Sequence, residues 1–429
     1  MRTRPSLYVL AVTAAVAAAA AAAPGSAAPT PRWAAPVLIS ETKASPEISL
    51  VLSPTDPRFL AACAPSGVPS IGNGQSYFHT TKDTGKTWAT VNVETSGTDT
   101  RKAAFEGGDC DVAFDQGGTL YSADTWLGNL SVGASTDGGT TWSGTALAVS
   151  APVVDRPWLV GGPKGTVYLS YHDLQCCMPS AMWFTKSTDF GKTFSPAVPI
   201  PTPGPEGAYI WEGNYVVAPN GKDFYLTYSR RLAPTEVDTG MDIFLAASHD
   251  GGLTWSSTLV ASLAKATSSI YPSIGLDGGG GLHVVWSAPE DDANPVFVTS
   301  SVDGGRTWSA PLALVSGATG YAPWVVGGAR RGEAAVVWLG SPSAKTGAAS
   351  DWYFYASRIK PGRGGRPSVN TGRTTPKPLF TGAQVAPEFE MVTLDKNGRM
   401  HIGMAVYRER ANGRNGWALY HQRELSIPR

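Results

Sequence analysis

The 429-residue sequence lacks a net charge, because its 34 lysines and arginines balance 34 aspartates and glutamates. It therefore has no overall field that would attract nucleic acid, and we expect no nucleic-acid partner. Charged residues of either sign are scarce, at 16% of the chain. It also lacks a phosphate-binding loop and any nucleotide, flavin or haem motif, so we expect no bound cofactor.

Long apolar runs are missing after the first 23 residues, which predicts that no later segment is stably inserted in a membrane. At the start, Arg2 and Arg4 precede an alanine-rich stretch from Tyr8 to Ala23, and small residues follow at 26–28. This order is typical of a secretory signal peptide. We therefore predict a signal peptide at residues 1–28 and a secreted, extracellular chain.

Cysteine is rare as well, with Cys63, Cys110, Cys176 and Cys177 as the four copies. Export favours disulfides, and four cysteines allow three pairings. One candidate bridge joins Cys63 to Cys110, which leaves the adjacent Cys176 and Cys177 to pair with each other. The alternative interpretation is a metal site that combines the thiols of Cys176 and Cys177 with His172 and the Asp173 carboxylate. We favour disulfides and expect no metal.

Glycine (49) and proline (33) are abundant, and an eight-residue pattern occurs five times. It reads Ser/Thr-x-Asp-x-Gly-x-Thr-aromatic, with its aspartates at Asp83, Asp137, Asp189, Asp250 and Asp303. Such an aspartate can accept hydrogen bonds from nearby backbone N–H groups, and the glycine suits a positive φ. A repeated catalytic or metal-binding aspartate is the alternative. Near-identical copies in successive repeats favour a structural turn between two strands.

The pattern resembles the Asp-box, or bacterial neuraminidase repeat, of sialidases and other Asp-box propellers. The resemblance covers about residues 33–425 and implies an all-β β-propeller. Strand-like segments also form two further repeats that lack the box, which predicts seven four-stranded blades. Six blades are the alternative, because the sialidase propeller has six. Residues 29–429 are expected to form this single domain.

The first and last strands of the propeller are expected to meet. The segment Trp33–Ser40 resembles the fourth strands of the repeats, whereas the seventh repeat stops one strand short. We therefore predict that the N-terminal strand completes the last blade and closes the ring, which removes exposed sheet edges. The basic segment Arg358–Lys377 is expected to be a flexible excursion between strands, with a polyanion-binding patch as the minor alternative.

Polar and aromatic side chains gather where first strands begin and second strands end, which a propeller places on one face. Acids, arginines and aromatics together suit a sugar site. The sialidase resemblance implies three arginines that hold a sugar carboxylate, a tyrosine nucleophile with a glutamate base, and an aspartate acid. By position, the candidates are Arg156, Arg230 and Arg408 for the arginines; Tyr407, Tyr271 or Tyr321 for the tyrosine; Glu212 or Glu390 for the base; and Asp155, Asp109 or Asp111 for the acid.

The sequence departs from sialidases in one motif. No Arg-Ile-Pro-like segment precedes Asp83, and Ile427-Pro428 is the only Ile-Pro pair in the chain. The candidate charges also have a structural interpretation, as ion pairs that fix the starts of strands. We therefore predict a sialidase-like glycoside hydrolase, or a protein that binds a glycan or glycoconjugate. The alternative is a non-catalytic extracellular propeller that binds a protein or a polysaccharide.

Overall fold

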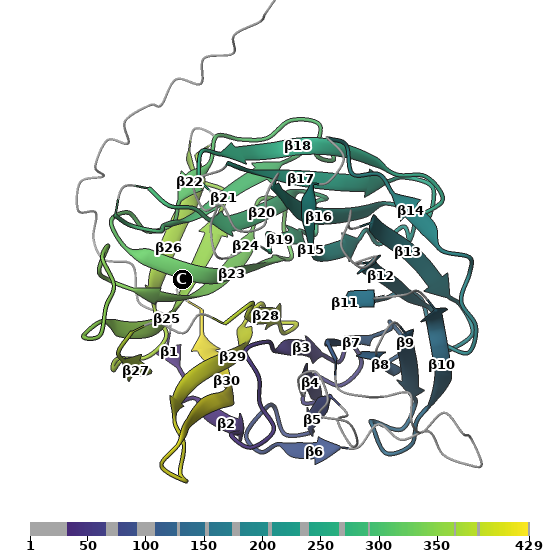
Figure 1. Cartoon of the computed structure of the whole chain (residues 1–429), viewed down its shortest axis with the longest axis horizontal. Helices are drawn as coiled ribbons and strands as arrows, with labels where there is room; N and C mark the ends of the chain where they lie inside the picture. The colour runs from purple at the N-terminus through teal and green to yellow at the C-terminus, as the bar shows by residue number, and fades with distance from the viewer. Residues whose placement is uncertain are drawn as a thin grey trace, which may run out of the picture.

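Seven antiparallel sheets surround one central axis in the computed structural model (Figure 1). The structure describes residues 32–65, 76–91, 108–126, 129–150, 154–173, 181–204, 208–231, 240–265, 271–290, 292–363, 366–383 and 387–427. Within these ranges there is no α-helix, and thus none that is long and apolar enough to cross a membrane. The all-β, seven-bladed propeller predicted from the sequence is confirmed. The predicted signal peptide lies outside the described residues.

In blades 1 to 6 the four main strands follow chain order, with the first innermost. Blade 1 contains β3 (Ser49–Leu52), β4 (Leu60–Ala64), β5 (Tyr77–Thr81) and β6 (Ala89–Val91). Blade 2 contains β7 (Cys110–Phe114), β8 (Leu120–Trp126), β9 (Asn129–Ser135) and β10 (Ser143–Ser150). Blade 3 contains β11 (Val154–Gly161), β12 (Val167–Asp173), β13 (Ala181–Ser187) and β14 (Val198–Ile200). Blade 4 contains β15 (Tyr209–Val217), β16 (Phe224–Arg231), β17 (Met241–Ser248) and β18 (Ser256–Leu263).

Blade 5 has four strands, whereas blades 6 and 7 each have a fifth short strand. Blade 5 contains β19 (Ser273–Leu276), β20 (Leu282–Ser287), β21 (Val296–Ser301) and β22 (Leu312–Ala313). Blade 6 contains β23 (Thr319–Gly327), β24 (Ala334–Ser341), β25 (Asp351–Lys360) and β26 (Ser368–Arg373), with β27 (Phe380–Thr381) also on β25. Blade 7 contains β28 (Met391–Leu394), β29 (Met400–Glu409) and β30 (Asn415–Ser426), with β1 (Arg32–Trp33) and β2 (Val37–Ser40) outside them.

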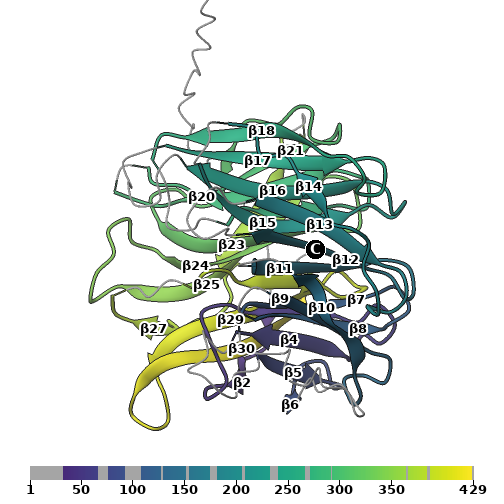
Figure 2. The same ribbon diagram turned by 45° about the vertical axis from the view of Figure 1, so that its right-hand side comes forward.

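The ring closes as predicted, because β1 and β2 supply the missing outer strand of blade 7. Trp33 pairs with Glu424 and Val37 pairs with His421, both on β30. The predicted strand is interrupted at residues 34–36, which include a proline. Figure 2 shows β2 beside β30, with β29 and β30 next to the strands of blade 1.

The repeated turn joins the third and fourth strands of blades 1 to 5, and its aspartate holds it together. In blade 3, Asp189 accepts hydrogen bonds from the hydroxyls of Ser187 (2.7 Å) and Thr193 (2.7 Å) and from the Thr193 backbone N–H (3.0 Å). Gly191 has a φ of 75°, which an L side chain would strain. All five copies show these carboxylate contacts, which fit a structural role in the turn.

The expected flexible excursion at Arg358–Lys377 is wrong in part. β25 continues to Lys360, and β26 returns antiparallel to it from Ser368 to Arg373. The segment therefore supplies the outer strand of blade 6. In blades 1 to 5 the repeated turn precedes the fourth strand and marks it in the sequence. Blade 6 lacks this turn, so β26 has no such marker in the sequence.

Candidate active site

A bulge in the first strand of blade 3 brings Arg156 to the centre of the ring. The pairing of β11 with β12 shifts between Asp155 and Trp158. Arg156 sits in this bulge with a φ of 49°, which is unfavourable for any residue with a side chain and more so before a proline. Blades 4 and 6 have the same register shift, but there the equivalent residues are Gly213 and Ala322. An arginine is therefore not needed to make the bulge, and its position indicates a separate role.

The Arg156 guanidinium is 2% exposed and binds acidic side chains from three other blades. Its Nη2 lies 2.5 Å from Glu47 Oε2, 3.3 Å from Asp109 Oδ1 and 3.7 Å from Glu388 Oε2. Glu47 precedes blade 1, Asp109 precedes blade 2 and Glu388 precedes blade 7. One cation thus ties four blades together, and a buried cation of this kind requires such compensation.

Aromatic rings lie against the guanidinium and fill the centre of the ring. Arg156 Cζ is 4.6 Å from the centroid of Phe389, 5.5 Å from that of Tyr271 and 5.6 Å from that of Trp158. Trp324 extends this cluster, with its ring 5.5 Å from Trp158. These distances fit cation–π and aromatic contacts. The acidic cluster therefore rests on a rigid apolar base.

Two carboxyl groups beside Arg156 have pKa values that move in opposite directions. Burial raises the pKa of Asp109 well above its usual value, although the charge of Arg156 opposes this. Burial also acts on Asp155, but hydrogen bonds with Asp109 and His172 bring its pKa well below the usual value. Asp155 Oδ2 lies 3.2 Å from His172 Nε2, and Asp155 Oδ1 accepts the backbone N–H of Arg156 at 2.9 Å. Asp155 is therefore the ionised member of the pair.

Glu388 is the most exposed acid of the cluster, at 44%. Burial of its carboxyl group and the neighbouring charge of Glu47 raise its pKa to about 7, against the opposing charge of Arg156. Asp155 is 34% exposed. The site thus presents to solvent one acid that holds a proton near neutral pH and one that does not. Opposite shifts in neighbouring acids are a mark of acid–base sites.

The other acids predicted from the sequence lie deeper. Glu212 is 0% exposed, and burial raises its pKa well above the usual value. Glu390 is equally buried, with a raised pKa, and accepts the backbone N–H of Ala405. Asp111 accepts the backbone N–H of Leu159 at 2.7 Å, which joins blades 2 and 3. These contacts suit structural roles within and between blades.

The predicted arginines and tyrosines are spread over several blades. Arg230 pairs with Asp242 at 2.8 Å in blade 4, and Arg408 pairs with Glu41 at 3.2 Å beside blade 7. The three arginines therefore have separate acidic partners. Tyr271 touches Arg156, and burial raises its pKa, so the phenol stays protonated. Tyr321 packs against Trp352 in blade 6, and Tyr407 packs edge-on against Trp417 in blade 7.

Cys63 in blade 1 and Cys110 in blade 2 form a disulfide, with their Cα atoms 6.3 Å apart. Both are buried, so the bond staples the inner part of two neighbouring blades. Cys176 and Cys177 lie outside the described residues. Among the residues that the structure does describe, no group of three or more acids, histidines or cysteines is arranged to hold a metal ion.

Sequence reasoning missed Glu47, and it placed Glu388 and His172 on this face without naming them as catalytic candidates. Glu47 stands alone between Pro46 and Ile48, without the polar neighbours that mark the other starts of first strands. Like Asp109 and Glu388, it lies within three residues before the first strand of a blade. An alignment of the seven repeats on their first strands would have found it.

No family profile matches the sequence, and no curated protein matches it. Solved structures of similar shape do exist. The polysaccharide lyase Uly1 has a TM-score of 0.54 and 11% identity, over 86% of this chain and 88% of that one. An ulvan lyase of polysaccharide lyase family PL25 has a TM-score of 0.50 and 12% identity, over 84% and 89%. An α-L-arabinanase from Penicillium chrysogenum, complexed with arabinobiose, has a TM-score of 0.48 and 17% identity, over 81% and 100%. At these identities the likeness concerns the fold.

Proposed function

We propose that this protein is a secreted glycan-cleaving hydrolase, with Glu388 as general acid and Asp155 as the ionised partner. The observation that carries the proposal is the pair of partly exposed carboxyl groups whose pKa values move apart around one buried arginine. Glycoside hydrolysis needs such a pair, one protonated and one ionised. The propeller fold, shared with polysaccharide-cleaving enzymes, adds support but does not decide the chemistry.

In the proposed reaction, the Glu388 carboxyl group gives its proton to the glycosidic oxygen as the bond to the sugar carbon breaks. The Asp155 carboxylate stabilises the positive charge that develops on the sugar, or activates the incoming water. His172 is a positioning residue, because its Nε2 holds Asp155 Oδ2 at 3.2 Å. Arg156 holds the acids in place through the ion pairs of its guanidinium, which is almost completely buried.

A neutral glycan suits this site better than an acidic sugar. A sialidase would use three arginines to hold a sugar carboxylate, but Arg156, Arg230 and Arg408 already pair with acids of their own. The described acids around Arg156 would also repel an anionic substrate. The proposal is therefore a broader glycoside hydrolase, with sialic acid as a substrate to be tested. Export is part of the proposal, and the Cys63–Cys110 disulfide fits an oxidising compartment.

The test is hydrolysis of a panel of neutral oligosaccharides, with a fluorogenic sialoside and a uronic-acid polymer alongside, measured as new reducing ends. Asp155→Asn and Glu388→Gln should each lower turnover at least a hundredfold. Asp292→Asn is the matched control, because Asp292 is an exposed acid that pairs only with Lys345 in the described structure. Products that carry an unsaturated sugar would instead indicate a lyase. Absence of any turnover would favour a glycan-binding or protein-binding propeller.

A further inference from the structure

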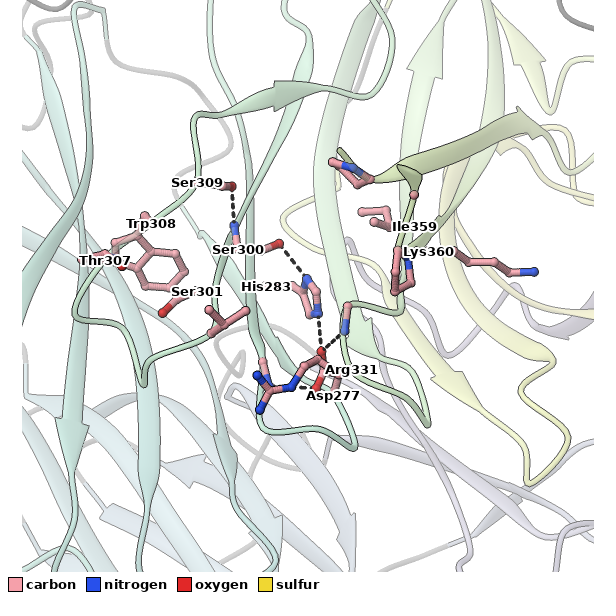
Figure 3. A pocket seen from close by; sticks show the side chains of 16 residues that line it. Asp277, His283, Ser300, Ser301, Thr307, Trp308, Ser309, Arg331, Ile359 and Lys360 are labelled. Atoms are coloured by element: carbon pink, nitrogen blue, oxygen red, sulfur yellow. Dashed lines mark hydrogen bonds and ion pairs between the residues drawn. The ribbon is translucent and has the colours of Figure 1, made fainter. Parts of the chain in front are cut away.

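A second chain of reactive side chains lies at the opposite end of the propeller, in a groove between blades 5 and 6. The groove has a volume of about 610 Å³, within the range of small-molecule sites. Its walls come from the turns of both blades, and the apolar part includes Trp308, Ile359 and Pro361. Figure 3 shows Ser300, His283 and Asp277 joined in a row along the blade 5 side of this groove.

The three side chains have the connectivity of a Ser–His–Asp triad. Ser300 Oγ lies 2.8 Å from His283 Nδ1, and His283 Nε2 lies 3.1 Å from Asp277 Oδ2. Asp277 also accepts backbone N–H groups of Gly279, Gly281 and Gly332, so both of its carboxyl oxygens act as acceptors. Because Asp277 Oδ2 accepts a hydrogen bond from Gly332, His283 is assigned as the donor to this oxygen through Nε2. The lone pair on Nδ1 therefore faces the Ser300 hydroxyl.

The degree of burial decreases from the acid to the serine. The side chains of Asp277 and His283 are 0% and 2% exposed, whereas Ser300 is half-buried and lines the groove. Burial also lowers the pKa of His283, so the imidazole is neutral at pH 7 and able to accept a proton. This order, with a buried acid, a neutral base and an accessible hydroxyl, is what an activated nucleophile requires.

The repeats of the propeller show that the fold does not require this trio. In blade 2, Asp115 caps the equivalent turn and accepts the Gly165 N–H from the next blade at 2.7 Å, as Asp277 does with Gly332. There the position of His283 is held by Tyr121, whose hydroxyl bonds Asp115 at 3.2 Å, and the position of Ser300 is held by Ala134. The aspartate thus holds the turn and the next blade in both cases. In blade 2 its side-chain partner is a tyrosine, so the turn does not require a histidine.

The same cross-strand pair can be compared in all seven blades. Beside His283 and Ser300, it is Ala61 with Thr80, Tyr121 with Ala134, Tyr168 with Lys186, Tyr225 with Ala247, Ala335 with Arg358, and His401 with Arg423. Blade 5 alone combines a histidine with a hydroxyl at this register. The combination is therefore a feature of this blade rather than of the fold.

The groove is also lined by the aromatic residue that ends the repeated turn of blade 5. Trp308 lines the groove, and its Nε1 is buried with no hydrogen-bond partner among the described residues. In two other copies of the repeated turn, Trp142 and Trp255 donate to the carbonyls of Gly139 (3.2 Å) and Gly252 (3.1 Å). The Trp308 and Trp88 copies differ from these two in that no described residue accepts from their Nε1.

We propose that Ser300 is the nucleophile of a second active site, which transfers acyl groups from uncharged carboxylic esters to water. Ser300 Oγ attacks the ester carbonyl carbon while its proton passes to His283 Nδ1. The bond to the alcohol oxygen then breaks, and the alcohol leaves with that proton. Water repeats the sequence on the acyl-serine, which releases the carboxylic acid and restores the hydroxyl. The apolar walls suit an uncharged acyl chain.

The test uses a fluorophosphonate probe for covalent labelling and p-nitrophenyl acetate for turnover, both on the full-length protein. The variants copy blade 2: Ser300→Ala reproduces Ala134, and His283→Tyr reproduces Tyr121, so both are expected to fold. Labelling should occur on the Ser300 peptide and disappear in both variants. Ester hydrolysis should fall at least a hundredfold. Ser262→Ala is the control, since this exposed serine bonds Asp242 without a histidine.

Two outcomes would overturn the proposal. One is a folded wild-type protein, verified by its melting transition, that carries no label on Ser300. The other is ester hydrolysis that is unchanged in Ser300→Ala. Because Ser300 belongs to blade 5 and the groove lies at the other end of the propeller, loss of this activity should leave any glycan cleavage at Asp155 and Glu388 intact.

Discussion

Glu47 Oε2 and Arg156 Nη2 lie 2.5 Å apart, although 109 residues separate them in the chain. The contact crosses from the segment before blade 1 to the first strand of blade 3. It therefore links two blades that are separated in the chain by blade 2. The acids around Arg156 thus include contacts that join different blades as well as the proposed reactive groups.

We expect Arg156→Gly to destabilise the protein by about 2–4 kcal/mol. Removing one partner of a buried ion pair costs about 3–5 kcal/mol, because the remaining acids stay buried without compensation. Glycine relieves the backbone strain at a φ of 49°, which returns about 1 kcal/mol. Urea unfolding at pH 7 measures the difference. The control is Arg408→Ala, which removes a partly exposed pair with Glu41 worth about 0–1 kcal/mol.

The loss in Arg156→Gly should be smaller at pH 5 than at pH 7. Glu388 has a pKa of about 7, so it is mostly protonated at pH 5 and no longer needs a positive partner. An equal loss at both pH values would contradict the assigned coupling between Glu388 and Arg156.

The pH dependence of glycan cleavage should show a fall above about pH 7. The general acid Glu388 must be protonated, and its raised pKa of about 7 means that the proton is lost as the pH rises through this value. Asp155 stays ionised well below neutral pH, because its pKa is lowered, so kcat/KM should be level from about pH 5 to pH 7. An optimum on the alkaline side of pH 8 would exclude Glu388 as the acid.

The repeated turn offers a local stability prediction. Asp189→Ala should destabilise the protein by about 1–2 kcal/mol. The turn of blade 3 would lose a carboxylate that accepts hydrogen bonds from two hydroxyls and two backbone N–H groups. Urea unfolding measures the change, and Asp292→Asn is the surface control. The pKa of Asp189 is lowered to about 2, so its contribution is present above about pH 4 and is lost as the pH falls toward 2. A variant with the same acid sensitivity as the wild type would contradict this role.

The repeated turn is also the part of the structure that the sequence predicted best. Its contacts lie within seven residues, from Ser187 to Thr193, so the residue order alone specifies them. Ring closure was predictable for a related reason, since Trp33–Ser40 resembles a fourth strand and one blade lacked one. Both inferences used local pattern and repetition rather than distant contacts.

The candidate site was less predictable, because it depends on contacts between blades. Asp155 and Arg156 stood out as a polar pair before an apolar strand, but their partner Glu47 did not. The geometry at Arg156 comes from a bulge with positive φ. An arginine before a proline does not predict that conformation. Arg230 and Arg408 had the right chemistry and sequence position, but their neighbours Asp242 and Glu41 supply local partners.

The disulfide should contribute about 4 kcal/mol to stability. It links Cys63 to Cys110 across 47 residues, and a loop of this length loses that amount of chain entropy in the unfolded state. The double variant Cys63→Ala/Cys110→Ala, compared with the wild type in urea, measures the contribution. Thiol titration before and after denaturation with reductant checks the bond itself. An equal thiol count in both titrations would contradict it.

Ring closure by the N-terminal strands gives a last prediction. A chain that starts at residue 41 lacks β1 and β2, and so exposes the edge of β30, where Val37 had paired with His421 and Trp33 with Glu424. Unpaired strand edges associate with other strands, so this chain should form oligomers in size-exclusion chromatography. A chain that starts at residue 32 is the control and should elute at the same volume as the wild type. A synthetic peptide of residues 32–40 should bind the truncated chain as an added strand and restore its hydrodynamic size. If the chain from residue 41 is monomeric and unfolds at the same urea concentration as the control, the outer strand of blade 7 does not hold the ring closed.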